Sequence, residues 1–186
     1  FFEDKDISSF KSLTVRHSGN DYNKSRLRDG FMQNIVKSRM DIDYQEFQPA
    51  LVFLNGDFWG HYNIREKLNE HYIAANHEEI DPDEIDYMEF NNEISTLHGS
   101  RDDFDIFMDF IENNDLSLSS NYDSVKSKMD INEYLNYYIS QIYFENQDWP
   151  QNNLKMWKSQ EKGSKWRWVL FDTDFGFGRF SNDPSY

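Results

Sequence analysis

The sequence predicts an α+β fold in which a small mixed part is followed by a mainly helical part. A short apolar run at 50–54 is followed by Asn-Gly, a dipeptide typical of the tight turn between two antiparallel strands. Apolar residues recur at helical spacing over 22–40 and 130–146, which predicts amphipathic helices. Two further strands, at 154–159 and 165–171, are joined by the Gly-containing segment QEKGS. The length of 186 residues suits one domain or a large piece of one.

The first part of the chain is expected to alternate strands with helices. Leu13 and Val15 stand between polar residues and are followed by Ser-Gly-Asn-Asp, which predicts a strand that ends in a turn within 10–21. The elements expected after this turn are a helix over 22–40, strands over 50–54 and 58–64, and a helix over 66–77.

The second part is expected to be mainly helical. Residues 77–102 are acidic and irregular, and we interpret them as a loop with one short strand, in which 78–87 is a solvated acidic segment. Helices are predicted over 102–115, 122–129 and 130–146. Asp130 and Glu133 have the spacing of a capping box at the start of the last helix. Its predicted buried stripe consists of Ile131, Tyr134, Leu135, Tyr138, Ile139 and Ile142.

Composition excludes several classes of function. The net charge is -15 and no basic run exists that could follow a phosphate backbone, so we expect no nucleic-acid partner. There is no cysteine, which excludes disulfides, thiolate nucleophiles and cysteine-type zinc sites. The five histidines show no zinc-binding spacing. No apolar run approaches the roughly 18 residues that cross a bilayer, so we expect no membrane span.

Two polar turns flank the second pair of strands. The segment NQDWPQNN (146–153) places Asp148 and Asn153 before the first of these strands, and Asp172 and Asp174 follow the second. Because these ends of a hairpin lie on the same side, we expect the turns to converge. Carboxylate and amide oxygens suit Mg²⁺, and a spare Asp can orient a hydroxyl and accept its proton. The structural alternatives are a helix stop at Trp-Pro and a solvated or calcium-type loop at DTDFG.

The spacing of these residues sharpens the prediction. Asp148 and Asn153 have the D-x-x-x-x-N spacing of the protein-kinase catalytic loop, and Asp174-Phe175-Gly176 matches the metal-binding DFG tripeptide. Each motif alone is weak, but their order after a long helix and around a hairpin is much stronger. The chain departs from ordinary kinases because no His-Arg precedes Asp148, and no V-A-I-K or Gly-rich phosphate loop is present.

Four segments resemble the signature blocks of the CotH (spore coat protein H) family of atypical protein kinases: VRHSGNDYNKSRLRDGFMQ, LVFLNGDFWGHYNIREKLNEHYI, NQDWPQNNLKMWK and KWRWVLFDTDFGFG. The resemblance covers most of 10–180 and is weakest over 78–130. It implies a two-lobed, protein-kinase-like fold that binds ATP with Mg²⁺ or Mn²⁺. It also implies phosphorylation of Ser or Thr on a coat or surface protein, and an extracellular or cell-surface location.

The motifs carry the family's roles onto particular residues. Asp148 resembles the catalytic Asp, and Asn153 resembles the metal-coordinating Asn. The literal DFG match favours Asp174 as the metal-binding Asp, whereas the position directly after the strand favours Asp172, and both are kept.

The order of segments implies an ATP-binding set. The strand at 10–16 resembles the lysine-bearing strand of the small lobe, so Arg16 is the candidate for contact with phosphate, with Asp29 as its possible helix partner. Arg65-Glu66-Lys67 would form the hinge, and Glu66, Lys67 and Lys155 complete the set.

The same order divides the chain into a small lobe at 1–66 and a mainly helical lobe at 67–186. We expect both lobes to be partial, because the glycine-loop hairpin would precede residue 1 and much of the large lobe would follow residue 186. The chain would then be a truncated domain.

Two other functions are compatible with the same residues. A kinase-like module that binds nucleotide or metal without turnover, in adhesion or as a scaffold, fits the missing His-Arg and glycine loop. A calcium-stabilised extracellular domain would use Asp172 and Asp174 in a structural site.

Overall fold

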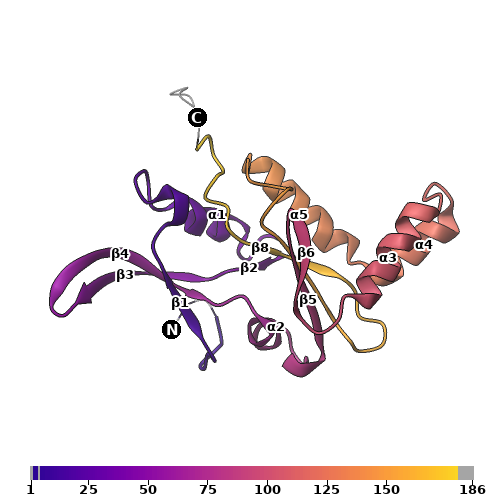
Figure 1. Ribbon diagram of the computed structural model, residues 1–186, viewed down its shortest axis with the longest axis horizontal. Coiled ribbons are helices and arrows are strands. Elements are labelled where there is room, and N and C mark those ends of the chain that lie inside the picture. Colours follow the sequence, from indigo (N-terminus) through magenta and orange to yellow (C-terminus); the bar gives the residue numbers. More distant parts are fainter. Residues whose placement is uncertain (1, 4, 180–186) are drawn as a thin grey trace.

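The structure is a computed structural model that describes residues 2–3 and 5–179, and it combines two β-sheets with helices (Figure 1). The strands are β1 (Leu13–Arg16), β2 (Asp43–Tyr44), β3 (Phe47–Leu54), β4 (Asp57–Glu66), β5 (Ile85–Asn91), β6 (Glu93–His98), β7 (Leu154–Ser159) and β8 (Arg167–Leu170). The α-helices are α1 (Arg28–Val36), α2 (Glu70–Asn76), α3 (Asp102–Asn113), α4 (Ser119–Lys128) and α5 (Ile131–Tyr143), and 3-10 turns occur at Gly19–Asp21 and Pro82–Glu84. The predicted α+β composition is confirmed.

The first sheet has the strand order β1-β4-β3 and is antiparallel throughout. The predicted Asn-Gly turn is confirmed, because Asn55 and Gly56 have φ values of 52° and 91° and connect Leu54 to its partner Asp57. The β3–β4 hairpin projects from one end of the molecule, and α3 and α4 lie at the opposite end (Figure 1).

The second sheet has the order β2-β8-β7-β5-β6, and it corrects the prediction for 77–102. This segment is not a loop with one short strand, since β5 pairs with β7 on one side and with β6 on the other. Ile85, Tyr87 and Met88 are buried, so the end of the predicted solvated segment 78–87 lies inside the protein. Acidic residues are concentrated in the 3-10 turn that precedes β5. Because of them, the start of this strand was assigned to a solvated acidic segment.

The two faces of this sheet bury different side chains, as the alternation along a strand requires. On one face, Tyr72 and Ile73 of α2 belong to a core cluster whose sheet residues are Ile85, Tyr87, Trp157 and Val169. On the other face, the sheet residues Met88, Met156, Trp168 and Leu170 belong to the larger core cluster, to which α1, α3, α4 and α5 contribute. The sheet is therefore the centre around which the helices pack.

Helix α1 is shorter than the predicted helix at 22–40. The buried Asp21 carboxylate accepts hydrogen bonds from the backbone N–H groups of Ser25, Leu27 and Arg28, and this holds the chain in turns before the helix begins. Met32 and Val36 are buried as predicted by their spacing, whereas Leu27 and Phe31 are exposed.

Helix α5 begins as predicted but buries a different face. The Asp130 side chain caps the helix by accepting a hydrogen bond from the Glu133 N–H at 3.2 Å. The Glu133 carboxyl group accepts from the Trp168 N–H, at 3.0 Å to each oxygen, so the return half of the predicted capping box goes to β8 instead.

The predicted buried stripe of α5 is wrong at three positions. Leu135, Ile139 and Ile142 are exposed, while the buried residues include Glu133, Tyr137, Ser140 and Gln141. Hydrogen bonds satisfy the polar members of this buried set, which periodicity of apolar residues alone does not reveal.

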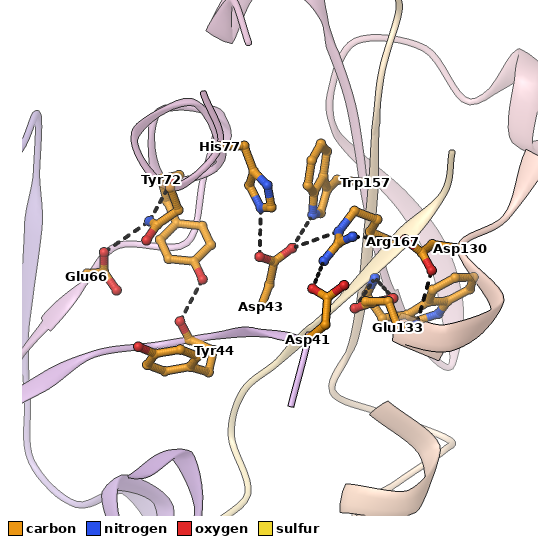
Figure 2. Close-up of polar contacts among 12 residues, drawn as sticks. Asp41, Asp43, Tyr44, Glu66, Tyr72, His77, Asp130, Glu133, Trp157 and Arg167 are labelled. Atoms are coloured by element: carbon orange, nitrogen blue, oxygen red, sulfur yellow. Dashed lines mark hydrogen bonds and ion pairs between the residues drawn. The ribbon is translucent and has the colours of Figure 1, made fainter. Parts of the chain in front are cut away.

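A network of polar side chains connects β2, the edge strand of the second sheet, to the inner strands of that sheet and to the region of α2 (Figure 2). The buried Asp43 carboxylate accepts from Trp157 Nε1 at 2.7 Å and contacts His77 Nε2 at 2.7 Å. Arg167 of β8 pairs with Asp41 at 2.8 Å and with Asp130 at 3.0 Å. This network fixes the segment between α1 and β3 against the sheet that carries the acidic turn at 172–174.

Within the described residues, no helix combines the length and apolarity needed to cross a membrane.

Glu133 gives a pH-dependent stability that can be measured. Burial raises the pKa of Glu133 from its ordinary 4.5 to about 9, so the folded protein holds this proton more tightly than the unfolded chain. Stability is then lost as the pH rises from about 4.5 towards 9. We expect Glu133→Gln to be more stable than the wild type at pH 8, by about 2 kcal/mol. The difference should shrink as the pH falls to 5 in urea unfolding.

Glu112→Gln, at an exposed position of α3, is the control and should show no such pH dependence. A gap between wild type and Glu133→Gln that stays constant from pH 5 to pH 8 would contradict the assignment of a proton to Glu133.

Candidate active site

Arg16 connects the first sheet to the acidic turn that follows the second. Arg16 ends β1, and Asp172 stands two residues after β8. The Arg16 Nη2 atom lies 2.6 Å from Asp172 Oδ1 and 3.8 Å from Asp174 Oδ2. The structure thus brings together three of the residues selected from the sequence, although 156 positions separate Arg16 from Asp172.

The loop after β1 covers Asp174. The Asn20 N–H donates a hydrogen bond of 2.6 Å to Asp174 Oδ2. Gly19 has a φ of +56°, and a Cβ at this position would lie 2.2 Å from Asp174 Oδ2 and 2.6 Å from Arg16 Nη2. The sequence predicted only a turn here, and the contact with Asp174 was missed. A glycine directly before Asn in a turn is a signal for close backbone approach, but it does not identify the group approached.

The two carboxylates of the acidic turn hold their protons more tightly than usual. Burial and the nearby negative charge of Asp172 raise the pKa of Asp174 to about 6. Burial also raises the pKa of Asp172, and the opposite charge of Arg16 counteracts this effect. An additional cation would stabilise the ionised form of both neighbouring carboxylates.

Asp29 has a different partner from the one expected. It was considered as a helix partner for Arg16, but its carboxylate forms a buried ion pair with Arg65 of β4. Its Oδ1 atom also accepts hydrogen bonds from the Thr173 N–H at 3.0 Å and from Thr173 Oγ1 at 2.8 Å. Although burial opposes the charged form, the Arg65 guanidinium holds the pKa of Asp29 well below its usual value.

Thr173 lies between Asp172 and Asp174 in the sequence. By binding Thr173, Asp29 therefore positions the acidic turn. Neither Arg65 nor Thr173 was selected from the sequence for this role. No local motif could have identified them, because the three residues meet only when α1, β4 and the acidic turn pack together.

The Asp148 carboxylate is held by amides of its own loop. Its Oδ1 and Oδ2 atoms accept hydrogen bonds from Asn152 Nδ2 at 2.8 Å and from Asn153 Nδ2 at 2.9 Å. Asn146, which is buried, contacts the Asp148 N–H at 3.4 Å and donates to Gln141 of α5 at 2.9 Å. Asp148 and Asn153, both selected from the sequence, contact each other directly, while Asn152 was not selected from the sequence.

The two polar turns lie at the same end of their hairpin, but their side chains do not form one cluster. The pairing of Lys155 with Val169 places the turns before β7 and after β8 side by side. Among the described residues, no hydrogen bond or ion pair joins Asp148 or Asn153 to Asp172 or Asp174, and no group of three or more His, Asp or Glu side chains is arranged to hold a metal ion.

The expected three-carboxylate cluster is therefore not formed, because Asp148 is held by amides of its own loop while Asp172 and Asp174 are engaged by Arg16 and Asn20. Asn153 has a φ of 58° and Asp172 a φ of 49°, in the left-handed region that Asn and Asp tolerate better than most residues. Both residues thus carry backbone conformations that cluster at functional sites.

Among the described residues, no hydrogen bond or ion pair joins the Arg16 side chain to the remaining residues of the expected ATP-binding set. Glu66 is buried, and its carboxylate accepts from Lys5 Nζ at 2.6 Å and from the Glu46 N–H at 2.9 Å, so this side chain holds local structure together. Lys67 is exposed. Lys155 pairs with Glu89 at 3.2 Å, and its ammonium group lies 4.9 Å from the centre of the Phe171 ring.

Substitution of Gly19 tests the contact between the loop and Asp174. We expect Gly19→Ala to lower the free energy of unfolding by roughly 2 to 3 kcal/mol, since Ala must adopt a positive φ and also displace Asp174 or Arg16. Gly163→Ala is the matched control, because Gly163 has a φ of +92° and open space around it. It should cost only about 1 kcal/mol. Equal losses in urea unfolding would argue against close packing at Gly19.

The Asp29–Arg65 pair should dominate the stability of this region. Asp29→Ala leaves a buried guanidinium without its partner, so we expect a loss of about 3 to 5 kcal/mol at pH 7. The Asp29→Ala/Arg65→Ala variant should lose clearly less than the sum of the single losses. Removal of the exposed Arg101–Asp105 pair serves as the control and should change stability little. Additive losses for Asp29 and Arg65 would contradict the pairing.

The chain was compared with known proteins and with models of protein families. No curated protein matched it. The family model described as CotH kinase protein matches residues 2–185, which is almost the whole chain. This match confirms the family resemblance seen in the sequence, and the chain belongs to the CotH kinase protein family.

Proposed function

We propose that the chain is a CotH-type atypical protein-kinase domain that transfers the γ-phosphoryl group of ATP to a Ser or Thr hydroxyl of a coat or surface protein, with Mg²⁺ or Mn²⁺. Membership of the CotH kinase family supports a kinase-like function. The observation that carries the proposal is the meeting of Arg16 with Asp172 and Asp174. Phosphoryl transfer needs a cationic side chain for phosphate and carboxylates for metal in one place, and this is where the chain provides both.

A kinase-like, two-lobed architecture is part of the proposal. The order β1, α1, β3, β4 and the antiparallel arrangement β1-β4-β3 support a small lobe within 1–66, followed by a lobe within 67–186. The boundary falls at the end of β4, where the hinge is proposed. Strand β2 lies within 1–66 but pairs with β8, so the first part also contributes to the sheet of the second.

The residues of the two turns have the side-chain chemistry that a divalent metal ion requires, although they are not gathered around one point in this structure. Asp172 and Asp174 offer neighbouring carboxylates with raised pKa values. A divalent cation would lower these pKa values by stabilising the ionised carboxylates. Asn153 uses its N–H₂ group on Asp148, which leaves its carbonyl oxygen as the atom available to a metal. These three residues would hold the metal through oxygen atoms, as Mg²⁺ prefers. When bound, the metal would supply positive charge to the phosphate oxygens of the nucleotide.

Asp148 is the proposed general base. Two amide groups fix its carboxylate, so little reorganisation is needed to orient an acceptor hydroxyl. In the reaction, the hydroxyl oxygen forms a bond to the γ-phosphorus, the bond from this phosphorus to the oxygen of the departing ADP breaks, and the hydroxyl proton passes to Asp148.

The proposed nucleotide contacts follow from the position of Arg16. Its guanidinium would contact phosphate oxygens, and Glu66 and Lys67 would present hinge backbone to adenine. Lys155 lies on β7 immediately after the Asp148 loop and is the remaining proposed contact. The Glu66 carboxylate, backbone N–H and carbonyl oxygen are all hydrogen-bonded inside the protein, so binding of nucleotide by the Glu66 backbone would require these bonds to be exchanged.

A second candidate function is a kinase-like binding module without turnover. Arg16 pairs with Asp172 and approaches Asp174, so its guanidinium offsets part of the negative charge of the acidic turn. A domain that kept this ion pair permanently would serve in adhesion or as a scaffold, and it would bind nucleotide weakly.

Nucleotide and metal binding test the proposal first. With ATP and Mg²⁺ or Mn²⁺ at about a hundredfold excess over Kd, we expect the Tm to rise by roughly 5 to 10 °C, and metal alone should give much less. Asp174→Ala should abolish the shift that needs both ligands. Asp148→Asn should keep the shift but lower the rate of phosphoryl transfer on the order of 100-fold or more, because only the general base is removed.

Asp109→Asn is the matched control for Asp148→Asn. Asp109 of α3 accepts from Asn113 Nδ2 at 2.9 Å, the same Asp–Asn pairing four residues apart that Asp148 makes with Asn152. It should leave both binding and rate unchanged. Full turnover by Asp148→Asn would refute the role of Asp148, and a shift produced by Ca²⁺ without any nucleotide effect would favour a calcium-stabilised domain instead.

A further inference from the structure

A groove lies between the loop after β1, the segment that leads into α1, and the β3–β4 hairpin. It consists of two adjoining hollows of about 410 and 340 Å³. Both hollows share four lining residues: Ser18, Arg26, His61 and Tyr62. Their volumes lie within the range of pockets that hold ligands. We call this feature the Arg26 groove.

The charge of the Arg26 groove is opposite to that of the whole molecule. The chain carries 34 acidic residues and a net charge of -15. Among the described residues that line the two hollows, however, there is no Asp or Glu, and the ionisable side chains are Arg26, His17, His61 and two tyrosines. The two acidic residues closest to Arg26 in the sequence are buried and have other partners: Asp21 pairs with Arg28 at 2.9 Å, and Asp29 pairs with Arg65. The groove therefore attracts anionic groups that most of the surface repels.

Arg26 is held in place with its charge uncompensated. Its Nε atom donates to the Tyr22 carbonyl oxygen at 2.7 Å, and its own carbonyl oxygen accepts from Ser18 Oγ at 2.9 Å. The residue has a φ of 62°, so the fold maintains a backbone conformation that few arginines adopt. In the described structure, neither Nη atom has a carboxylate within ion-pair distance. The guanidinium is thus positioned to pair with a carboxylate from outside the chain.

Large apolar side chains border the same groove. Leu27 and Leu51 line the larger hollow and Tyr22 and Trp59 the smaller one, and all four are more than half exposed. Exposed apolar residues gathered around a hollow mark a surface that another molecule covers. A binding partner therefore needs both negative charge and an apolar side chain.

We propose that the Arg26 groove binds an acidic peptide segment that contains one apolar or aromatic anchor residue. The anchor would fill a hollow against Trp59 or Leu51, and flanking carboxylates would pair with Arg26. A nucleic-acid backbone fits less well, because it requires a series of cations and this groove offers only one permanent positive charge.

The groove adjoins the candidate active site. His17 and Ser18 line it, and they connect Arg16 to Gly19 and Asn20, which contact Asp174. A peptide bound here would lie next to the loop that covers the acidic turn. A role in docking the protein acceptor would rest on the proposed phosphoryl transfer, whereas binding of the peptide does not depend on it.

The test measures peptide binding without nucleotide or metal. A fluorescein-labelled synthetic peptide with one Phe flanked by Asp and Glu residues is titrated with the chain, and fluorescence anisotropy is recorded. We expect saturable binding that weakens as NaCl is raised, since the exposed charges are screened. Arg26→Glu should weaken it on the order of tenfold or more. Trp59→Ala should also weaken binding of this peptide. With a peptide in which Ala replaces the Phe, Trp59→Ala should change the affinity little.

Arg39→Glu is the matched control. Arg39 is exposed, lies outside the groove, and donates to the carbonyl oxygen four residues earlier, as Arg26 does. This variant has the same net charge as Arg26→Glu and should bind the peptide like the wild type. Unchanged binding by Arg26→Glu, equal losses in both variants, or equally tight binding of a peptide with Lys in place of Asp and Glu would each overturn the proposal.

The outcome is independent of catalysis. Specific peptide binding without any phosphoryl transfer would support the groove and leave the proposed kinase activity without support. Phosphoryl transfer by a chain that does not bind the peptide would support the activity and overturn the groove. Because Arg26, Arg39 and Trp59 are exposed, circular dichroism should show the same fold in all variants.

Discussion

The buried carboxylate of Asp29 is the interaction on which the arrangement of the candidate site depends. It joins three segments, since it lies on α1, pairs with Arg65 of β4, and accepts two hydrogen bonds from Thr173. A buried charge without such partners would cost several kcal/mol, so the three segments are held in one relative placement. Thr173 lies between Asp172 and Asp174, and the placement of both carboxylates follows from this single anchor.

Arg16 and Asp172 then meet because both of their strands are fixed. Strand β1 pairs with β4, which carries Arg65, and the acidic turn is held by Asp29. The network around Asp43 fixes the chain between α1 and β3 to the second sheet (Figure 2). The Arg16–Asp172 contact is partly exposed, whereas the contacts that place its two members are buried. The buried contacts would therefore stay in place if Arg16 exchanged Asp172 for a phosphate group of the proposed nucleotide.

Local sequence signals predicted the elements that depend on local chemistry. The Asn-Gly turn and the start of α5 at Asp130 each arise from residues close in the chain. The strand β5 was missed because it follows an acidic turn, and it becomes a strand only through pairing with β6 and β7. The exposed stripe of α5 was assigned to the core because its buried face is polar and depends on hydrogen bonds such as Glu133 to Trp168.

The same limit applies to the candidate site. Spacing selected Asp148, Asn153, Asp172 and Asp174 as candidates, since the motifs that contain them are short. The expected meeting of all the carboxylates failed, because Arg16 and Asn20 engage the acidic turn while Asn152 and Asn153 engage Asp148. Neutral amides and one guanidinium make these contacts. An expectation based on the positions of the carboxylates alone does not include them.

Charge distribution connects the two proposals physically. Two neighbouring carboxylates with raised pKa values and a net charge of -15 disfavour the approach of any anion to the acidic turn, ATP included. An anionic nucleotide and an acidic peptide therefore both need local positive charge. Arg16 provides it beside the acidic turn, and Arg26 provides it in the groove. The two arginines also line one small hollow together. Because a Cβ at Gly19 would meet both Asp174 and Arg16, only a residue without a side chain lets the loop at 17–20 run this close to the acidic turn.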